Sequence, residues 1–160
     1  MLRLVLIRHA KSAWDEPGLV DFDRPLAPRG RRAAKWIGET LRKEGWVPGR
    51  VLCSAAARTR ETVALAEIAQ EAIYDREIYD LMSADFVDVI RRRGGATKVL
   101  ALVGHNTGME TTAMLLAADN ADFGGYPTGA IAVLDFDIRD WSELREGSGR
   151  LAAFCRPPKG

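Results

Sequence analysis

The chain has 160 residues, of which 47% are hydrophobic and 28% charged, the balance of an ordinary soluble globular protein. Its 23 basic and 22 acidic residues leave a formal net charge of +1, so no global field attracts nucleic acid or an anionic membrane, and any anion site must be local. The length predicts one domain over residues 1–160. Two cysteines, Cys53 and Cys155, make no disulfide framework and match no metal-ligand spacing, and no apolar run is long enough for a signal peptide or a membrane span. We therefore expect a cytoplasmic protein.

A nearly continuous apolar run, Leu2–Ile7, opens the chain and predicts a central strand covered on both faces. It stops abruptly at Arg8 and His9, and Lys11 and Ser12 follow. In open α/β sheets the carboxyl ends of the strands are where ligands bind, so these polar side chains are predicted to face a ligand site. Taken alone, His9 could be an ordinary surface histidine at a strand end.

The tetrapeptide Arg8-His9-Ala10-Lys11 resembles the opening signature of the histidine phosphatase superfamily, which reads Arg-His-Gly or Arg-His-Ala. A long loop over residues 13–29, with several prolines and acidic residues, follows and leads into a helix that begins near Pro28 and ends at Gly45. The phrase Asp-Arg-Pro-Leu-x-x-x-Gly over residues 23–30 is similar to the segment after the histidine motif in the small, bacterial phosphohistidine-phosphatase branch.

A short strand, Val51–Cys53, ends at Ser54, and a helix begins close to Arg58. The pattern Ser-x-x-x-Arg-Thr-x-x-Thr over residues 54–62 is similar to the second hallmark of the family; the alternative is an exposed arginine at a helix start. Cys53 and Arg58 also invite comparison with the Cys-x5-Arg loop of cysteine-dependent phosphatases. Their spacing is one residue shorter, so the loop could not close round a phosphate, and Cys53 is expected to be a core residue.

Residues 72–74 and 78–81 together predict a strand-like stretch, after which Ser83 or Ala84 opens a helix that ends at Gly94. Three arginines, residues 91–93, lie near the end of that helix. They could mark a nucleic-acid patch, but the near-zero net charge favours a solvated helix end, where the helix dipole stabilises cations.

The clearest buried strand, Val99–Val103, ends at Gly104-His105-Asn106, which is similar to the third hallmark of the family. The chain has only two histidines, and both follow a central strand. A helix containing Thr112 comes next, then a strand over residues 128–136 and its hairpin partner over residues 150–155. This order predicts an α/β fold: a three-layer α/β/α sandwich with a mostly parallel central sheet and an antiparallel edge hairpin.

The resemblance implies a phosphate pocket built from Arg8, His9, Arg58 and His105. The neutral imidazole of His9 can attack phosphorus in line and give a phosphohistidine intermediate that water hydrolyses. The two guanidiniums can clamp the phosphoryl oxygens, and the second imidazole can donate a hydrogen bond from the opposite side. Lesser substrate contacts are expected from Lys11, Ser12 and Asn106. No metal or other cofactor is expected, because the arginines already supply positive charge.

Larger members of the family carry an acidic residue that protonates the leaving oxygen, often within a large helical insertion. Here the corresponding segment is short, and four carboxylates are possible without any recognisable motif: Asp15, Glu77, Asp80 and Asp85. A short insertion implies an open site, which suits a phosphate carried on a protein side chain. Hydrolysis of phosphohistidine also depends less on a general acid, since its leaving imidazole is far less basic than an alkoxide.

The sequence therefore predicts a metal-independent phosphatase of phosphohistidine on a protein, such as a histidine phosphocarrier or a phosphotransfer domain, with no nucleic-acid or membrane partner. A phosphatase or mutase acting on a small phosphorylated metabolite is the alternative. A non-catalytic phosphate-binding module is a third reading. The presence of both histidines argues against it, because the arginines alone could bind phosphate.

Overall fold

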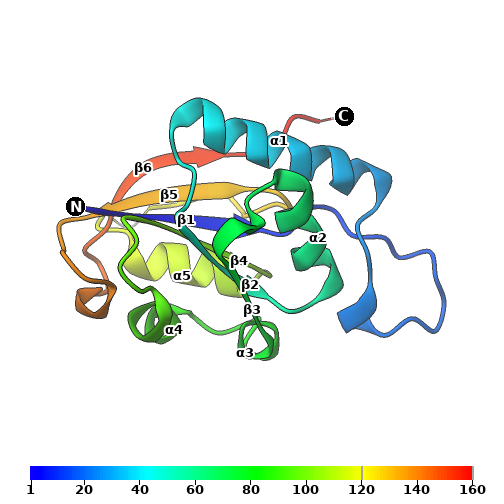
Figure 1. Cartoon of the computed structure of the whole chain (residues 1–160), viewed down its shortest axis with the longest axis horizontal. Helices are drawn as coiled ribbons and strands as arrows, with labels where there is room; N and C mark the ends of the chain where they lie inside the picture. The colour runs from blue at the N-terminus through cyan, green and yellow to red at the C-terminus, as the bar shows by residue number, and fades with distance from the viewer. Residues whose placement is uncertain (120, 160) are drawn as a thin grey trace.

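A computed structural model describes residues 1–119 and 121–159. At its centre lies a six-stranded sheet in the order β3-β2-β4-β1-β5-β6 (Figure 1). The strands are β1 (Leu2–Arg8), β2 (Arg50–Ser54), β3 (Ala72–Asp75), β4 (Val99–Gly104), β5 (Ile131–Phe136) and β6 (Arg150–Cys155). The first four run parallel, β5 is antiparallel to β1, and β6 is antiparallel to β5. The predicted sheet, with its antiparallel edge hairpin, is confirmed.

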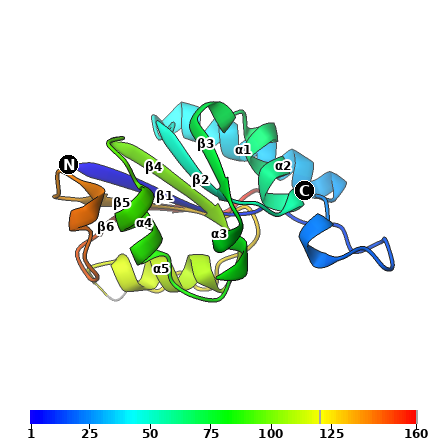
Figure 2. The ribbon, with the colours of Figure 1, turned by 60° about the horizontal axis from the view of Figure 1, so that its bottom comes forward.

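Helices cover both faces of this sheet. They are α1 (Pro28–Glu44), α2 (Ala57–Ala66), α3 (Arg76–Asp80), α4 (Val87–Arg93) and α5 (Gly108–Leu116), with short 3₁₀ turns η1 (Asp21–Asp23), η2 (Ala69–Glu71) and η3 (Trp141–Glu143). Figures 1 and 2 show α1 and α2 on one side of the sheet and α4 and α5 on the other. This is the predicted three-layer arrangement. In the described part of the chain, none of these helices combines the length and apolar character needed to cross a bilayer.

The strand β1 is apolar on both faces because both faces are covered. Leu4 and Leu6 join the core cluster that includes the inward residues of α4 and α5, whereas Val5 and Ile7 join the cluster formed with α1 and α2. All four side chains are fully buried. Successive residues of a strand point to opposite faces, so a run without alternation is what a doubly covered strand requires.

The helix α1 forms where the sequence predicts it. Pro28 occupies its first turn, and Gly45 ends it in the left-handed conformation, with φ at 75° and its N–H bonded to the carbonyl of Leu41. Gly38 faces α2 so closely that a Cβ at this position would overlap the carbonyl of Ala66. The close packing of α1 on α2 therefore depends on glycine at this point.

The strand-like stretch predicted up to Leu81 is wrong in its second half. The strand β3 ends at Asp75, and residues Arg76–Asp80 form the helix α3. The Asp75 carboxylate accepts a hydrogen bond of 2.9 Å from the backbone N–H of Glu77, which caps a helix N-terminus directly after the strand.

The next helix, α4, begins at Val87 instead of Ser83 or Ala84. The N–H of Phe86 is bonded outside the helix, to the hydroxyl of Thr112 at 3.0 Å, and this contact fixes the preceding turn against α5.

The strand β5 begins at Ile131, three residues later than predicted. Gly129 has φ at 79°, outside the range of a strand, and its N–H donates to the carbonyls of Arg8 and His9. The chain therefore turns tightly against the end of β1 before the strand starts.

The three arginines of residues 91–93 each have a partner. Arg91 donates to the carbonyl of Leu144, Arg92 pairs with Asp88 and Glu77, and Arg93 pairs with Asp75. This arrangement agrees with a helix end and not with a free basic patch.

The strand register brings three polar positions to one edge of the sheet. Arg8 at the end of β1 pairs with Gly104 at the end of β4, and Cys53 near the end of β2 pairs with Val103 of β4. His9, Ser54 and His105 are the next residues along these three neighbouring strands.

Candidate active site

A pocket of about 220 Å³ opens at this edge, and all seven predicted site residues line it: Arg8, His9, Lys11, Ser12, Arg58, His105 and Asn106. Four further residues line it that were not predicted from the sequence: Trp14, Arg24, Met82 and Thr128. The pocket is thus built by the segments that follow β1, β2 and β4, together with Met82 after α3 and the turn before β5. No carboxylate is among its lining residues.

The two histidine rings face one another in this pocket. Their centroids are 5.2 Å apart and the ring planes are tilted by 54°. Nδ1 of His9 lies 2.7 Å from the carbonyl oxygen of Ala10. Since a carbonyl can only accept, Nδ1 carries the proton and Nε2 of His9 keeps its lone pair. This is the tautomer that a nucleophilic imidazole needs.

His105, which follows β4, is held by a hydrogen bond to the neighbouring strand β2. Its Nε2 lies 2.8 Å from the hydroxyl oxygen of Ser54, the last residue of β2. Its Nδ1 is buried and, within residues 1–119 and 121–159, has no hydrogen-bond partner, and the same is true of Nε of Arg8. Buried polar atoms without partners are uncommon in proteins and gather at functional sites.

Both imidazoles are neutral at physiological pH. Burial lowers the pKa of His9 to about 3, and the nearby charges of Arg58 and Arg8 act in the same direction. Burial also lowers the pKa of His105 to about 3, again reinforced by the charge of Arg58. The site thus combines two permanent cations with two uncharged nitrogen bases.

We expect neither imidazole to take up a proton between pH 8 and pH 5 in the ligand-free protein, because both pKa values are about 3. Long-range ¹H–¹⁵N NMR spectra report the charge of each ring directly, and a His105→Gln variant assigns the two sets of signals. A titration midpoint near 6.5 for either ring would contradict the assignment of both as neutral bases.

The same shift has a consequence for stability. Each histidine has a folded pKa of about 3 and an unfolded pKa of 6.5, so between these two pH values unfolding is accompanied by uptake of a proton. The free energy of unfolding is unaffected above about pH 6.5 and falls by at most about 1.4 kcal/mol per pH unit per histidine as the pH drops towards 3. Urea denaturation at several pH values measures this free energy. Between pH 6.5 and pH 3 it should fall less steeply with decreasing pH in His105→Gln than in the native sequence.

Arg58 is oriented by a residue of the long loop that the sequence analysis did not select. Its guanidinium donates to the backbone carbonyl of Asp21 at 2.8 Å and to the Asp21 carboxylate at 3.1 Å. The same carboxylate accepts hydrogen bonds from Arg24 and from the hydroxyl of Tyr79, each at 2.7 Å. Asp21 thus ties the loop to the start of α2.

Asp21 stays ionised in this network. Burial raises its pKa, but the hydrogen bond from Tyr79 and the charge of Arg58 outweigh burial and hold the pKa at about 2. A carboxylate of this kind has no proton to donate at neutral pH. Its contacts suit a residue that positions Arg58.

None of the four carboxylates considered from the sequence lines the catalytic pocket. Glu77 and Asp80 form ion pairs with arginines. Asp85 accepts a hydrogen bond from the backbone N–H two residues further on. Asp15 lines another hollow of about 170 Å³ on the long loop, which shares Trp14 and Arg24 with the catalytic pocket.

Cys53 lies in the core cluster between the sheet and the helices α1 and α2, as predicted. Burial raises the pKa of its thiol, so it is not a thiolate at neutral pH. The cysteine-phosphatase reading of residues 53–58 therefore has no support.

Residues 4–89 match the family model of the histidine phosphatase superfamily (branch 1). The chain belongs to the histidine phosphatase superfamily. An uncharacterised protein of Mycobacterium tuberculosis is 35% identical over 159 residues, which cover 94% of this chain and 99% of that relative. The resemblance seen in the sequence motifs is confirmed.

Solved structures place the chain in the SixA-like branch of this family. The structure of a candidate phosphohistidine phosphatase SixA from Agrobacterium tumefaciens is 35% identical, with a TM-score of 0.78 and coverage of 97% of each chain. A second candidate SixA, from Nakamurella multipartita, has a TM-score of 0.83 and 28% identity over 98% of this chain and 96% of that chain. The family and these neighbours support phosphatase activity.

Proposed function

We propose that this member of the histidine phosphatase superfamily is a metal-independent phosphatase that uses His9 as its nucleophile and removes the phosphoryl group from phosphohistidine on a protein. The observation that carries this proposal is the pair of neutral histidines, with ring centroids 5.2 Å apart, in a pocket that Arg8 and Arg58 also line. Binding alone would not need two uncharged imidazoles.

In the first step Nε2 of His9 attacks phosphorus, and the bond from phosphorus to the leaving nitrogen breaks as the new P–N bond forms. The substrate imidazole already carries a proton on its other ring nitrogen, so it leaves as a neutral ring and needs no proton from the enzyme. The hydrogen bond from Nδ1–H to the Ala10 carbonyl stabilises the positive charge that the ring gains. In the second step water attacks phosphorus, the P–N bond to His9 breaks, and orthophosphate leaves with Nε2 again unprotonated. His105, on the facing side, can contact the transferring group in both steps.

The two arginines supply the charge that the phosphoryl oxygens require. Arg58 is almost fully buried and fixed by Asp21, and Arg8 donates to the backbone carbonyl of Tyr126 at 2.8 Å. Burial lowers the pKa of Arg8, and the charge of Arg58 lowers it further, so the two cations repel one another. A phosphoryl group between them would offset that repulsion, which favours anion binding without a metal.

The substrate class is supported by the chemistry of the pocket wall. With no carboxylate among the lining residues, the site suits a leaving group that departs without a strong acid, and imidazole is such a group. The assignment of both SixA-like neighbours as candidate phosphohistidine phosphatases agrees with this choice. A histidine phosphocarrier or a phosphotransfer domain would present the phosphohistidine.

The proposal is tested by orthophosphate release from a phosphohistidine carrier protein, compared with a phosphoserine peptide and a panel of sugar phosphates. We expect kcat/KM to be at least about 100-fold higher for phosphohistidine, the scale of the acid catalysis that an ester would lack here. A preference for any sugar phosphate would overturn the substrate class and favour the metabolite phosphatase.

No single carboxylate among Asp15, Glu77, Asp80 and Asp85 is expected to be essential for phosphohistidine hydrolysis. Each carboxylate-to-amide variant should keep kcat/KM on a phosphohistidine peptide within about tenfold of the native value. A loss of about 100-fold or more, typical for removal of a general acid, would reveal a dedicated proton donor instead.

Asp21→Asn separates positioning from acid catalysis. It weakens the hold on Arg58, so we expect a loss of about tenfold that is the same for aryl phosphates of high and low leaving-group pKa. A loss that grows as the leaving group becomes more basic would make Asp21 the general acid.

A further inference from the structure

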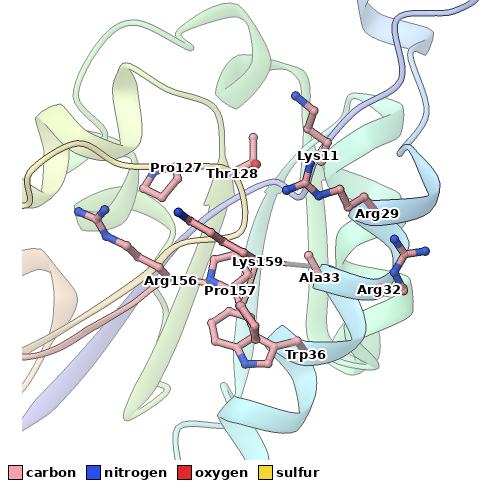
Figure 3. Close-up of a pocket in the computed structure, with 11 residues that line it drawn as sticks. Lys11, Arg29, Arg32, Ala33, Trp36, Pro127, Thr128, Arg156, Pro157 and Lys159 are labelled. Atoms are coloured by element: carbon pink, nitrogen blue, oxygen red, sulfur yellow. The ribbon is translucent and has the colours of Figure 1, made fainter.

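A second and larger hollow, of about 540 Å³, adjoins the catalytic pocket. It lies between α1 and the segment that follows β6 (Figure 3). Lys11 and Thr128 line both the hollow and the catalytic pocket, so a ligand held in one could extend into the other. We call this hollow the basic groove.

The walls of the basic groove are strongly cationic. Five of its eleven lining residues are basic and none is acidic; the basic ones are Lys11, Arg29, Arg32, Arg156 and Lys159. Within residues 1–119 and 121–159, none of these five forms an ion pair. In a chain with a net charge of +1, this concentration of cations beside the catalytic pocket is a local feature that favours an anionic ligand.

The arginines of the basic groove come from two sides, and apolar surface lies between them. Figure 3 shows Arg29 and Arg32 on the α1 side and Arg156 on the opposite side, near Pro127. Between these arginines lie Pro157, Ala33 and the side chain of Lys159, and below them lies Trp36, which is only partly buried (Figure 3). Pro127 and Pro158 also line the groove. A single second phosphate would need cations that converge on one point. Cations spread across the groove suit carboxylates spaced along an extended chain, with apolar side chains between them.

We propose that the basic groove binds an acidic segment of the phosphoprotein substrate, next to the phosphohistidine, while the phosphoryl group occupies the catalytic pocket. This inference rests on the proposed function. It assigns the groove to substrate selection: partners with acidic residues beside the phosphohistidine are bound more tightly, and the chemical step is unchanged.

The test uses two peptides of the same length, one with Glu and Asp beside a central histidine and one with Gln and Asn in those places. Fluorescence polarisation measures the Kd of the unphosphorylated, labelled peptides, and steady-state kinetics measure kcat and KM of the phosphorylated ones. We expect the acidic peptide to have a Kd and a KM about tenfold lower at low ionic strength, with similar kcat values, and the difference to shrink as NaCl is raised.

The matched variants are the double charge reversal Arg29→Glu/Arg32→Glu and the control Lys35→Glu. Lys35 is exposed on the same helix but lines a separate hollow with Glu39 and Arg42. The double variant should lose the preference for the acidic peptide and favour a peptide with lysines in those places. A gain of affinity for the lysine peptide cannot come from misfolding. The control should retain the native preference.

Equal affinity of the native protein for the acidic and neutral peptides would overturn the inference, as would an equal loss in Lys35→Glu. Tighter binding of inorganic triphosphate than of the acidic peptide, lost in the double variant, would assign the groove to a second phosphate and overturn it too. The binding measurements need no turnover. Groove-dependent binding without phosphohistidine hydrolysis would therefore overturn the proposed function and support the groove assignment.

Discussion

Replacement of His9 by alanine is expected to lower turnover of every phosphorylated substrate by roughly 10⁴-fold or more, because it removes the group on which the proposed covalent intermediate forms. His105→Ala should cost less, about 10²–10³-fold, since it removes a hydrogen-bonding partner and leaves the nucleophile. Stopped-flow or steady-state phosphate assays measure both. Full activity in His9→Ala would remove the basis for a covalent mechanism on this residue.

Binding in the His9→Ala variant provides the control for folding. The two arginines remain, so the variant should still bind orthophosphate or tungstate, measured by calorimetry. Loss of both binding and turnover would indicate a damaged pocket. In that case His9→Asn, which keeps a polar side chain near the Ala10 carbonyl, is the variant to assay.

Replacement of Arg8 or Arg58 by lysine is expected to cost about 2–4 kcal/mol of transition-state stabilisation, measured as the fall in kcat/KM. Lysine keeps the charge but loses the planar fork that can bond a phosphoryl group and a fixed partner at once. Arg58 needs that fork most, because it also holds two oxygens of Asp21.

Arg60→Lys is the matched control for these substitutions. Arg60 lies two residues after Arg58 on α2, but it is exposed and its guanidinium donates to the carbonyl of Ala55 and stacks on Tyr74. It should change kcat/KM less than twofold. Activity that survives the combined Arg8→Lys and Arg58→Lys substitutions would contradict the phosphate clamp.

The sequence was most informative where apolar strands end in polar residues. The runs before His9 and His105 are apolar at nearly every position, which only a doubly covered strand explains, and so both histidines could be assigned to the same sheet edge. Arg58 could be assigned to the same sheet edge because it follows the end of a third such strand. The order of the strands explains why these three ends meet.

Residues placed by tertiary structure alone could not be predicted. Asp21 sits in a loop without apolar periodicity, and nothing local shows that this loop folds back onto Arg58. The basic groove joins Arg32 of α1 to Arg156 near the other end of the chain, a proximity that appears only once α1 covers the sheet beside β5 and β6.

The error over residues 78–81 reflects competition between strand propensity and helix capping. Residues 78–81 contain Ile, Tyr and Leu, which suit a buried strand as well as a short helix. The side-chain hydrogen bond from Glu77 N–H to Asp75 decides for the helix, and such a cap is hard to distinguish from an ordinary turn residue in sequence alone.

Trapping the phosphoenzyme tests the central claim most directly. The native protein is mixed with excess phosphohistidine carrier, quenched within milliseconds in alkaline denaturant, digested, and analysed by mass spectrometry. We predict phosphate on His9 alone, stable in base and labile in acid, formed at least as fast as turnover and absent from His9→Ala. Phosphate on Cys53 or His105, or rapid turnover with no phosphoenzyme at any time, would contradict His9 as the nucleophile.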